Sequence, residues 1–219
     1  SLISKNDATL YVLDGVIDKK MQDILKEDGI IVKAYNDIYE DVKSLQGKVL
    51  LDDLLVNYQI CSNLNCEIVK MTNPTQYFKA IKNETEINAT KNAHLKDGVA
   101  MTKFMYWLKT NVGKIDLDEV IISDKLEEFR KEQADFYDLS FDTICGYKEN
   151  AALMHYKALP EKCAKVTDEG MLLIDSGGQY IDGTIDTTRT FVLGEISDIE
   201  RRDFTVALKA LLRLQAAHF

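Results

Sequence analysis

One stretch of the chain, LLIDSGGQYIDGTIDTTRT from Leu172 to Thr190, constrains the fold more than any other feature. It opens with a short apolar run, which is typical of a buried strand. The dipeptide Asp182-Gly183 follows, and it is a strong signal for a tight turn between antiparallel strands. A threonine-rich strand completes the pattern. We therefore predict a β-hairpin here.

Two aspartates, Asp175 and Asp186, interrupt this predicted hairpin. With a two-residue turn at Asp182-Gly183, Gln179 would face Asp186. Because side chains on a strand alternate with a period of two, Asp175 and Asp186 would then point to the same face. They would still lie four residues apart along the ladder, about 13 Å, which is too far to share one ion. A wider loop, or a bulge at Gly177-Gly178, would bring them together.

Carboxylates that share an apolar pocket repel each other and cost desolvation energy. A shared proton, an arginine or a metal ion relieves this. Arg189 falls on the opposite face from Asp186 by strand parity, so a divalent ion is the attractive solution. Oxygen ligands alone suit manganese or magnesium, and an added histidine suits manganese, cobalt or zinc. The alternative is that Asp175 caps a turn and Asp186 lies in a loop.

His155 is the other candidate, within the segment AALMHYKALP. The segment is predicted to be a strand, with His155 on the same face as Ala151 and Leu153. A lone histidine in such a place is more often a hydrogen-bonded structural residue. His94 falls within a predicted helix and His218 at the end of the sequence, so we assign both to packing or surface roles.

The remaining chain is predicted to mix helices and strands in a layered fold of the α/β (α+β) class. Residues 1 to about 75 alternate short strands and helices, and Pro74 lies in a polar passage taken as a boundary. Helical spacing predicts long helices at about 84–112 and 117–134. The second has a charged face that is expected to be solvent-exposed, formed by Glu127, Glu128, Arg130, Lys131 and Glu132. A last helix opens with the capping box of Ser197 and Glu200.

Composition narrows the function classes. Apolar residues make up 46 % of the chain, enough for a normal core. Lys and Arg number 27 against 36 Asp and Glu, so the net charge of −9 argues against a nucleic-acid partner. No apolar run is long enough to predict a membrane span, and the first residues lack a signal-peptide layout. The spacings of the four cysteines fit neither a redox pair nor a zinc site, which suggests a reducing, cytoplasmic location.

The segment SFDTICGYKENAALMHYKALP, followed by LLIDSGGQYIDGTIDTTRTF, closely resembles the aminopeptidase P (Xaa-Pro aminopeptidase) branch of the creatinase and methionine aminopeptidase superfamily. KNETEINATKNAHLKDGVAMTKFMYWL is similar to the first helix of the catalytic domain in that family. The resemblance covers almost the whole chain. It implies that residues 1–75 are the C-terminal part of a creatinase-type middle domain. Residues 76–219 would then be the N-terminal half of a pita-bread metallopeptidase domain.

The resemblance also implies a function. Members of the family hydrolyse the bond between an N-terminal residue and a following proline, using two divalent metal ions, usually manganese. Asp175 and Asp186 match the first two metal ligands of the family. His155 matches the catalytic histidine that positions the substrate and stabilises the transition state. A peptide substrate with proline at its second position and a homodimer are the partners to be expected.

This sequence also departs from the family pattern. The remaining ligands of the family are one histidine and two glutamates from the second half of the domain, and no segment here matches them. The chain is therefore expected to be an internal fragment of an aminopeptidase P that is inactive alone. Two alternatives stay open. The parent could be a metal-free pita-bread protein that serves as a binding module or scaffold, or it could be a hydrolase of the prolidase or creatinase type.

Overall fold

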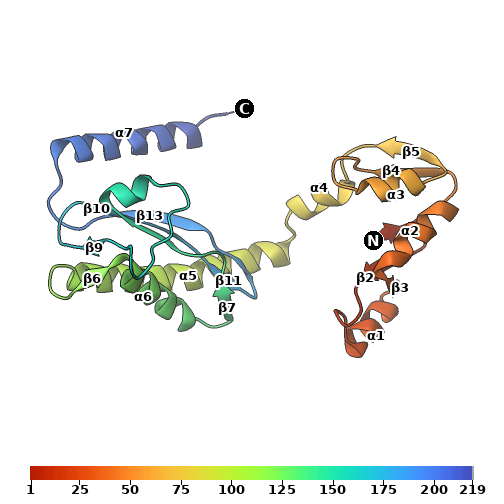
Figure 1. Cartoon of the computed structure of the whole chain (residues 1–219), viewed down its shortest axis with the longest axis horizontal. Helices are drawn as coiled ribbons and strands as arrows, with labels where there is room; N and C mark the ends of the chain where they lie inside the picture. The colour runs from red at the N-terminus through yellow and green to blue at the C-terminus, as the bar shows by residue number, and fades with distance from the viewer. Residues whose placement is uncertain (219) are drawn as a thin grey trace. The chain divides into compact units, whose positions relative to one another are not determined.

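The computed structural model describes residues 1–218, and the chain divides into two compact units, Ser1–Ile81 and Lys82–Phe219 (Figure 1). Both units combine helices with short strands, so the predicted mixed α/β class is confirmed. Among the described residues, no helix is both long enough and apolar enough to cross a membrane.

The first unit is built from two small sheets and short helices. Strands β2 and β3 pair in parallel, as do β4 and β5, while β1 adds to β2 in the antiparallel sense. Its elements are β1 (Leu2–Ile3), β2 (Ala8–Val12), α1 (Lys19–Glu27), β3 (Ile30–Ala34), η1 (Tyr35–Asp37), α2 (Ile38–Asp41), η2 (Val42–Ser44), β4 (Lys48–Leu51), α3 (Tyr58–Asn63), β5 (Glu67–Lys70) and α4 (Pro74–Ala80).

Local signals explain most of these elements. Asp18 caps α1 by accepting a hydrogen bond from the amide of Met21. Pro74 occupies the first turn of α4, where its missing N–H costs nothing. Between β3 and β4 the helical stretch is divided into the three short elements η1, α2 and η2.

The second unit carries the predicted hairpin. Its elements are α5 (Glu84–Asn111), β6 (Leu117–Asp118), α6 (Glu119–Lys131), β7 (Phe136–Leu139), β8 (Ile144–Tyr147), η3 (Lys148–Ala152), β9 (Lys165–Val166), β10 (Met171–Ser176), β11 (Gly178–Tyr180), β12 (Gly183–Thr184), β13 (Thr187–Val192) and α7 (Asp198–Gln215). One three-stranded antiparallel sheet has the order β13-β10-β8, and a second has the order β12-β11-β7. The hairpin runs through both sheets.

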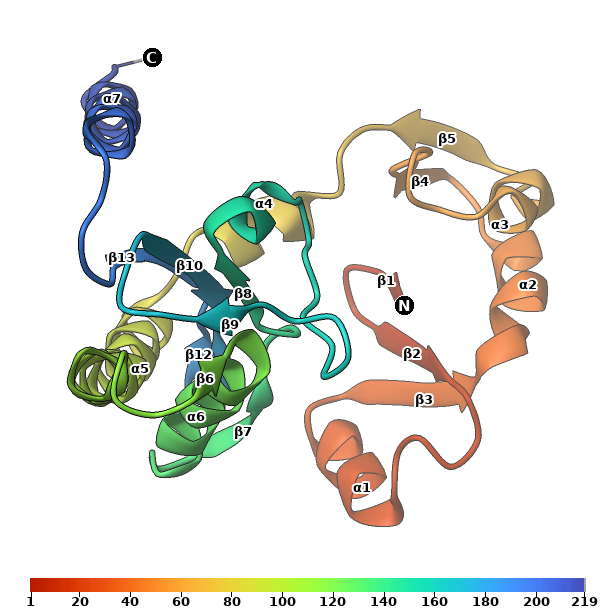
Figure 2. The same ribbon diagram turned by 60° about the vertical axis from the view of Figure 1, so that its left-hand side comes forward.

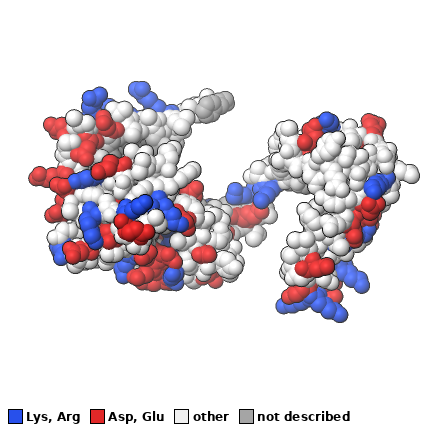
Figure 3. All heavy atoms as spheres, in the orientation of Figure 1, with Lys and Arg blue, Asp and Glu red and all other residues white. Residues whose placement is uncertain are grey.

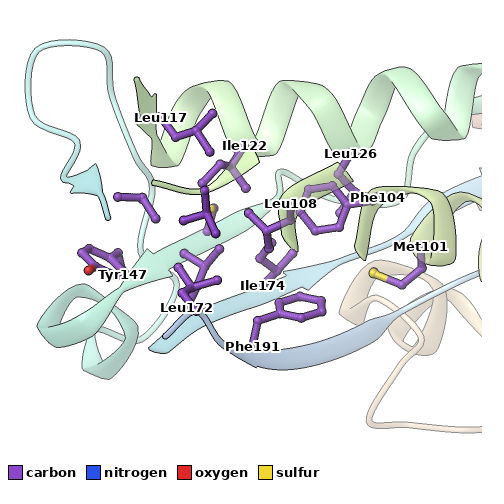
Figure 4. Close-up of a cluster of buried hydrophobic side chains, with 14 residues drawn as sticks. Met101, Phe104, Leu108, Leu117, Ile122, Leu126, Tyr147, Leu172, Ile174 and Phe191 are labelled. Atoms are coloured by element: carbon purple, nitrogen blue, oxygen red, sulfur yellow. The ribbon is translucent and has the colours of Figure 1, made fainter. Parts of the chain in front are cut away.

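The core of the second unit lies between the β13-β10-β8 sheet and helices α5 and α6 (Figure 4). From the sheet, Leu172, Ile174 and Phe191 point into it, and they meet Phe104 and Leu126 from the helices. Leu172, Ile174, Phe104 and Leu126 are fully buried, and each such side chain contributes about 1.5–3 kcal/mol relative to full exposure. This packing fixes which face of β10 points inward.

The opposite face of the same sheet, here called the outer face, carries Leu173 and Asp175 of β10. Helix α7 lies on the outer side of the sheet, away from α5 and α6, in both ribbon views (Figures 1 and 2). None of the residues of α7 is buried. The outer face is therefore only partly covered by the described residues.

One sequence-based expectation about α6 is wrong. Arg130 is expected on a solvent-exposed charged face, but it is fully buried. Its guanidinium donates to the carboxylate of Asp97 in α5, at 2.7 Å from Nε and 3.2 Å from the second nitrogen. The hydroxyl of Tyr180 in β11 also donates to Asp97, at 3.2 Å. Burial is possible because this partner neutralises the charge.

Charged side chains are scattered over the exposed surface. On the face of the second unit shown in Figure 3, acidic and basic residues are interspersed, with no large field of one sign. Lys96 of α5 bonds both Asp135 and Asp182, at 2.8 and 2.7 Å, and so ties the hairpin turn to the helix. This contact lowers the pKa of the Asp182 carboxyl.

Candidate metal and substrate site

The two aspartates lie on the outer face, closer together than the sequence predicted. Strand β10 pairs with β13 so that Asp175 is directly opposite Thr188, and Asp186 precedes Thr188 by two residues. Asp186 lies one residue before β13, and the bond from the amide of Ile185 to the carbonyl of Gly178 keeps the same register there. Because residues two apart along such a ladder share a face, Asp186 is the diagonal neighbour of Asp175. Such diagonal positions are about 7–8 Å apart. Two carboxylates at this separation can reach a common ion or adjacent ions.

The position of the turn accounts for the difference. Tyr180 pairs with Gly183, so the two-residue turn consists of Ile181 and Asp182, and not of Asp182 and Gly183. The predicted turn was wrong by one residue, which changes the register of the hairpin by two. The register of the Tyr180–Gly183 pair is the same as that of the Asp175–Thr188 pair. The hairpin therefore needs no bulge at Gly177.

Gly177 marks the point where the hairpin passes from one sheet to the other. A side chain there would place its Cβ only 1.7 Å from the carbonyl oxygen of Ile185. The amide of Ile185 donates to the carbonyl of Gly178 at 2.9 Å, and the hydroxyl of Ser140 donates to the carbonyl of Ile185 at 2.7 Å. Only glycine allows this close approach of the two strands. The crossing lies directly before Asp186, which is exposed.

Asp175 is partly buried, and its orientation is fixed by a neighbour that the sequence did not indicate. The hydroxyl of Thr188 donates to Oδ1 of Asp175 at 2.8 Å. Hydrogen bonds of this kind hold ligand side chains in place at metal sites. Thr188 could have been found from the sequence only with the correct turn, because its role depends on being the cross-strand partner of Asp175.

Arg189 is the partner of Ile174 on β13, so its position belongs to the opposite face from the aspartates, as strand parity predicted. Its guanidinium donates to Oγ1 of Thr187 and to the carbonyl of Thr188, at 3.0 and 2.8 Å. Among the described contacts, Arg189 makes none with either aspartate. The two acidic groups are therefore not neutralised by this arginine.

The segment that carries His155 also belongs to the outer face, although it is not a strand. The expected strand over 151–158 is wrong, because η3 and an irregular stretch occupy these positions. Gly146 of β8 lies opposite Leu173, and a Cβ on it would stand 2.8 Å from the Cα and N of Ala151. The backbone of η3 therefore rests on the outer face, where glycine leaves room for it.

His155 follows this contact by four residues, which span at most about 14 Å. It is exposed, and its backbone has a left-handed φ of +52°. His94 is exposed on α5 and its ring nitrogen contacts the carbonyl of Thr90, in line with a surface role. The helix η3 thus tethers His155 to the outer face, which also carries Asp175, while His94 lies on α5.

An open groove of about 370 Å³ continues this face beyond the aspartates. It is lined by Lys148, Glu149, Ala151, Met171, Leu173, Thr190 and Glu200. Leu173 and Thr190 are cross-strand partners, each two residues from Asp175 or Thr188 on the same face. The groove is partly apolar and begins one outer-face position beyond Asp175, so it offers space for a ligand chain on that side of the carboxylate.

A buried carboxylate, that of Glu119, contacts the segment that carries His155. The hydroxyl of Tyr156 donates to Glu119 of α6 at 2.7 Å, and Glu119 is fully buried. Desolvation, followed by this hydrogen bond, raises the pKa of Tyr156 to about 12. No sequence pattern indicates the contact, because Glu119 lies in a helix whose other acidic residues are mostly surface groups.

The residues present fit part of a metal centre. Asp175 and Asp186 offer hard oxygen donors, which suit manganese or magnesium. Within residues 1–218, no group of three or more histidine, cysteine, aspartate or glutamate side chains is placed to hold an ion. Divalent ions of this kind normally take about six ligands. The pair is thus a partial ligand set.

Comparison with known proteins identifies the family. Residues 88–219 match the model of metallopeptidase family M24, and residues 1–86 match the Creatinase/Prolidase N-terminal domain. The chain belongs to metallopeptidase family M24. The resemblance that the motifs indicated is confirmed, and the mixed helices and strands match the pita-bread class of fold.

Similar M24 proteins are named after their action on proline-containing peptides. The probable Xaa-Pro aminopeptidase P of Neurospora crassa is 35% identical over 234 residues, which cover 100% of this chain and 34% of that protein. The corresponding protein of Sclerotinia sclerotiorum is 34% identical and covers 99% of the chain and 38% of its own length. The chain thus spans little more than a third of the curated relatives it matches.

Solved structures agree with the fold. The X-prolyl aminopeptidase from Caenorhabditis elegans, described as a cytosolic enzyme with a di-nuclear active site, has a TM-score of 0.79 at 25% identity. That match covers 90% of this chain and 34% of the other. The Xaa-Pro dipeptidase from Bacillus anthracis has a TM-score of 0.71 at 24% identity, covering 96% and 59%. At that identity the second likeness supports the fold alone.

Proposed function

We propose that the whole protein, the product of the complete reading frame containing these 219 residues, is a metal-dependent Xaa-Pro aminopeptidase. The observation that carries this proposal is the position of Asp175 opposite Thr188, with Asp186 two residues before Thr188, in an M24 chain. The 34–35% identity with probable Xaa-Pro aminopeptidases supports the substrate class. We further propose residues 1–75 as the end of a creatinase-type middle domain and 76–219 as the first half of a pita-bread domain.

Each site residue then has a distinct role. Asp175 and Asp186 bind two divalent ions, for which we propose manganese because both donors are carboxylate oxygens. Thr188 orients Asp175 through its hydroxyl. Bound ions of this kind lower the pKa of a water and polarise the substrate carbonyl. His155 donates a hydrogen bond to the substrate at the carbonyl that precedes proline, where negative charge develops in the transition state.

The proposal extends to the partners and the location. The substrate is a peptide with proline at its second position, and the groove beside Leu173 and Thr190 gives room for its chain. We propose a cytoplasmic homodimer that binds neither nucleic acid nor membranes. The mixed surface charges and the net charge of −9 support the absence of a nucleic-acid partner.

Two substitutions test the division of roles. Asp186→Asn removes a full negative charge from a site for hard cations, so metal content and turnover should both fall steeply. His155→Ala should leave metal bound and lower turnover about 100-fold, the usual cost of one such donor. Metal content by mass spectrometry, measured beside steady-state kinetics, distinguishes them. If His155→Ala lost metal while Asp186→Asn kept metal and activity, the assignment would be reversed.

The length of the accepted substrate separates this proposal from a prolidase. The whole protein should cleave an Xaa-Pro-Pro tripeptide, whereas a prolidase would act on the Xaa-Pro dipeptide. A protein with neither activity and no bound manganese would instead be a scaffold relative without metal. The 219-residue chain alone should show no turnover above a manganese blank, because its described residues place no group of three or more potential ligand side chains around an ion.

A further inference from the structure

The carboxylate of Glu119 is the centre of a hydrogen-bond cluster outside the metal-binding face. It is fully buried, and it lies in the first turn of α6, where the helix dipole favours a negative charge. Its donors are the amide of Tyr147 at 2.7 Å, the amide of Ala164 at 2.8 Å, Nδ2 of Asn150 at 3.0 and 3.2 Å, and the hydroxyl of Tyr156 at 2.7 Å. A carboxylate has about four acceptor positions, so this one is fully used.

All four donors come from one segment, residues 147–164. Two of them, Tyr147 and Ala164, are its ends, and the other two lie between. The amide of Glu119 also donates to the carbonyl of Ala164, at 3.3 Å. Between η3 and β9 this segment forms no helix or strand. The side chain of Glu119 in α6 therefore holds the two ends of the segment together. It also orders the middle of the segment, which has no regular backbone hydrogen bonding of its own.

His155 lies inside this segment and directly before Tyr156. A left-handed backbone is uncommon for a residue other than glycine, and it persists where surrounding contacts determine it. The amide of Tyr156 donates to the carbonyl of Leu153 at 3.2 Å, which closes a turn around His155. The hydroxyl of the same tyrosine is held by Glu119. Glu119 thus holds the residue that directly follows His155 in the sequence.

We propose that Glu119 is the positioning residue for His155, which it holds over the outer face through the 147–164 segment. The inference rests on the proposed function, because His155 matters for turnover only if the whole protein cleaves Xaa-Pro peptides. Glu119 itself touches no substrate. Its contribution is the placement of the histidine, and a displacement of about 1 Å at a reacting group can cost on the order of 100-fold in rate.

Glu119→Gln is the sharpest perturbation, since it preserves shape but replaces one acceptor oxygen with an NH₂ donor. That donor must face either the Tyr147 or the Ala164 amide, so one end of the segment loses its partner. We expect turnover to fall about 10- to 100-fold, with metal content unchanged. The effect of Glu119→Gln should be divided between KM and kcat in the same way as the effect of His155→Ala.

The test is a double-mutant cycle in the manganese-loaded whole protein, with steady-state kinetics on an Xaa-Pro-Pro tripeptide. If Glu119 acts through His155, Glu119→Gln should cost nothing further once His155 is alanine. Glu128→Gln is the matched control: Glu128 is on the same helix, its side chain is 62% exposed, and it pairs only with Lys125 among the described ion pairs. The control should keep wild-type kinetics.

Tyr156→Phe provides a milder variant if Glu119→Gln does not fold. It removes one hydroxyl from the cluster and should lower turnover less, again with no added loss beside His155→Ala. Hydrogen exchange should quicken in peptides covering residues 147–164 in both variants and stay unchanged in Glu128→Gln. This readout reports the order of the segment without any catalysis.

Multiplicative losses in the cycle, or wild-type turnover in Glu119→Gln, would overturn the positioning role. Unchanged exchange across residues 147–164 would overturn it as well. A wild-type protein that binds manganese but cleaves no Xaa-Pro peptide would refute the proposed function. In that case faster exchange in Glu119→Gln would still show that Glu119 holds the segment, and the failure would lie with the function and not with the contact.

Discussion

The buried pair of Asp97 and Arg130 offers the sharpest test of how the second unit is held together. The side chains of Arg130 and Asp97 are 0% and 3% exposed, and the pair joins α5 to α6. The hydroxyl of Tyr180, in the hairpin, donates a hydrogen bond to the same carboxylate of Asp97. One nitrogen of Arg130 has no hydrogen-bond partner among the described residues, so the guanidinium depends on Asp97. The pair therefore anchors the hairpin to the helices.

Asp97→Ala should destabilise the second unit by about 3–5 kcal/mol. The substitution leaves a buried guanidinium and the Tyr180 hydroxyl without their acceptor, and an unpaired buried charge is costly. Folded domains are stable by only about 5–15 kcal/mol, so the loss is a large share of the total. With a urea slope of about 2 kcal/mol per molar, the midpoint should fall by about 1.5–2.5 M.

The assay is urea unfolding followed by tryptophan fluorescence. Trp107 is the one tryptophan among the 219 residues, and it packs against the core of the second unit. The signal therefore reports on that unit alone. Glu132→Ala is the control, because Glu132, the C-cap of α6, pairs with Lys103 of α5 at 2.7 Å in an exposed position. An exposed pair contributes about 0–1 kcal/mol.

Replacing the whole cluster should separate the charge penalty from packing. The triple variant Asp97→Leu, Arg130→Met, Tyr180→Phe removes every polar group that depends on the pair, so its midpoint should return to the wild-type value or exceed it. The reasoning would be refuted if Asp97→Ala cost no more than Glu132→Ala. It would also be refuted if the triple variant were less stable than Asp97→Ala.

Two further predictions concern the segment over the outer face. Gly146→Ala should lower the free energy of unfolding by about 1–3 kcal/mol in the same titration, because the new Cβ would stand 2.8 Å from the backbone of Ala151. Gly98→Ala should raise it, because Gly98 lies inside α5 and its new Cβ would meet no atom within 4 Å. Equal effects at both glycines would contradict this. Burial and the Glu119 contact raise the pKa of Tyr156 to about 12, so the folded state keeps a proton that the unfolded chain loses above pH of about 10. Stability should therefore fall as the pH rises from about 10 to 12, and Tyr156→Phe should reduce that fall; an undiminished fall would rule out this linkage.

Local patterns predicted the parts of the fold that depend on backbone geometry alone. The alternation along β10 correctly separates buried Leu172 and Ile174 from Asp175, because successive side chains on a strand point to opposite faces. Helical spacing located α5 over Glu84–Asn111, against the expected 84–112. The two aspartates could likewise be assigned to one face from strand parity. The observed register differs from the predicted one by two residues, and a shift of two leaves every side chain on the same face.

The tertiary structure decided what local patterns leave open. The turn at Ile181-Asp182 sets the register, and its choice depends on contacts beyond the dipeptide, including the bond from Lys96 to Asp182. Arg130 and Glu119 are buried although their residue types favour the surface, because other elements supply a carboxylate for one and four donors for the other. A charge can leave water only when such partners are assembled around it, and those partners are distant in sequence.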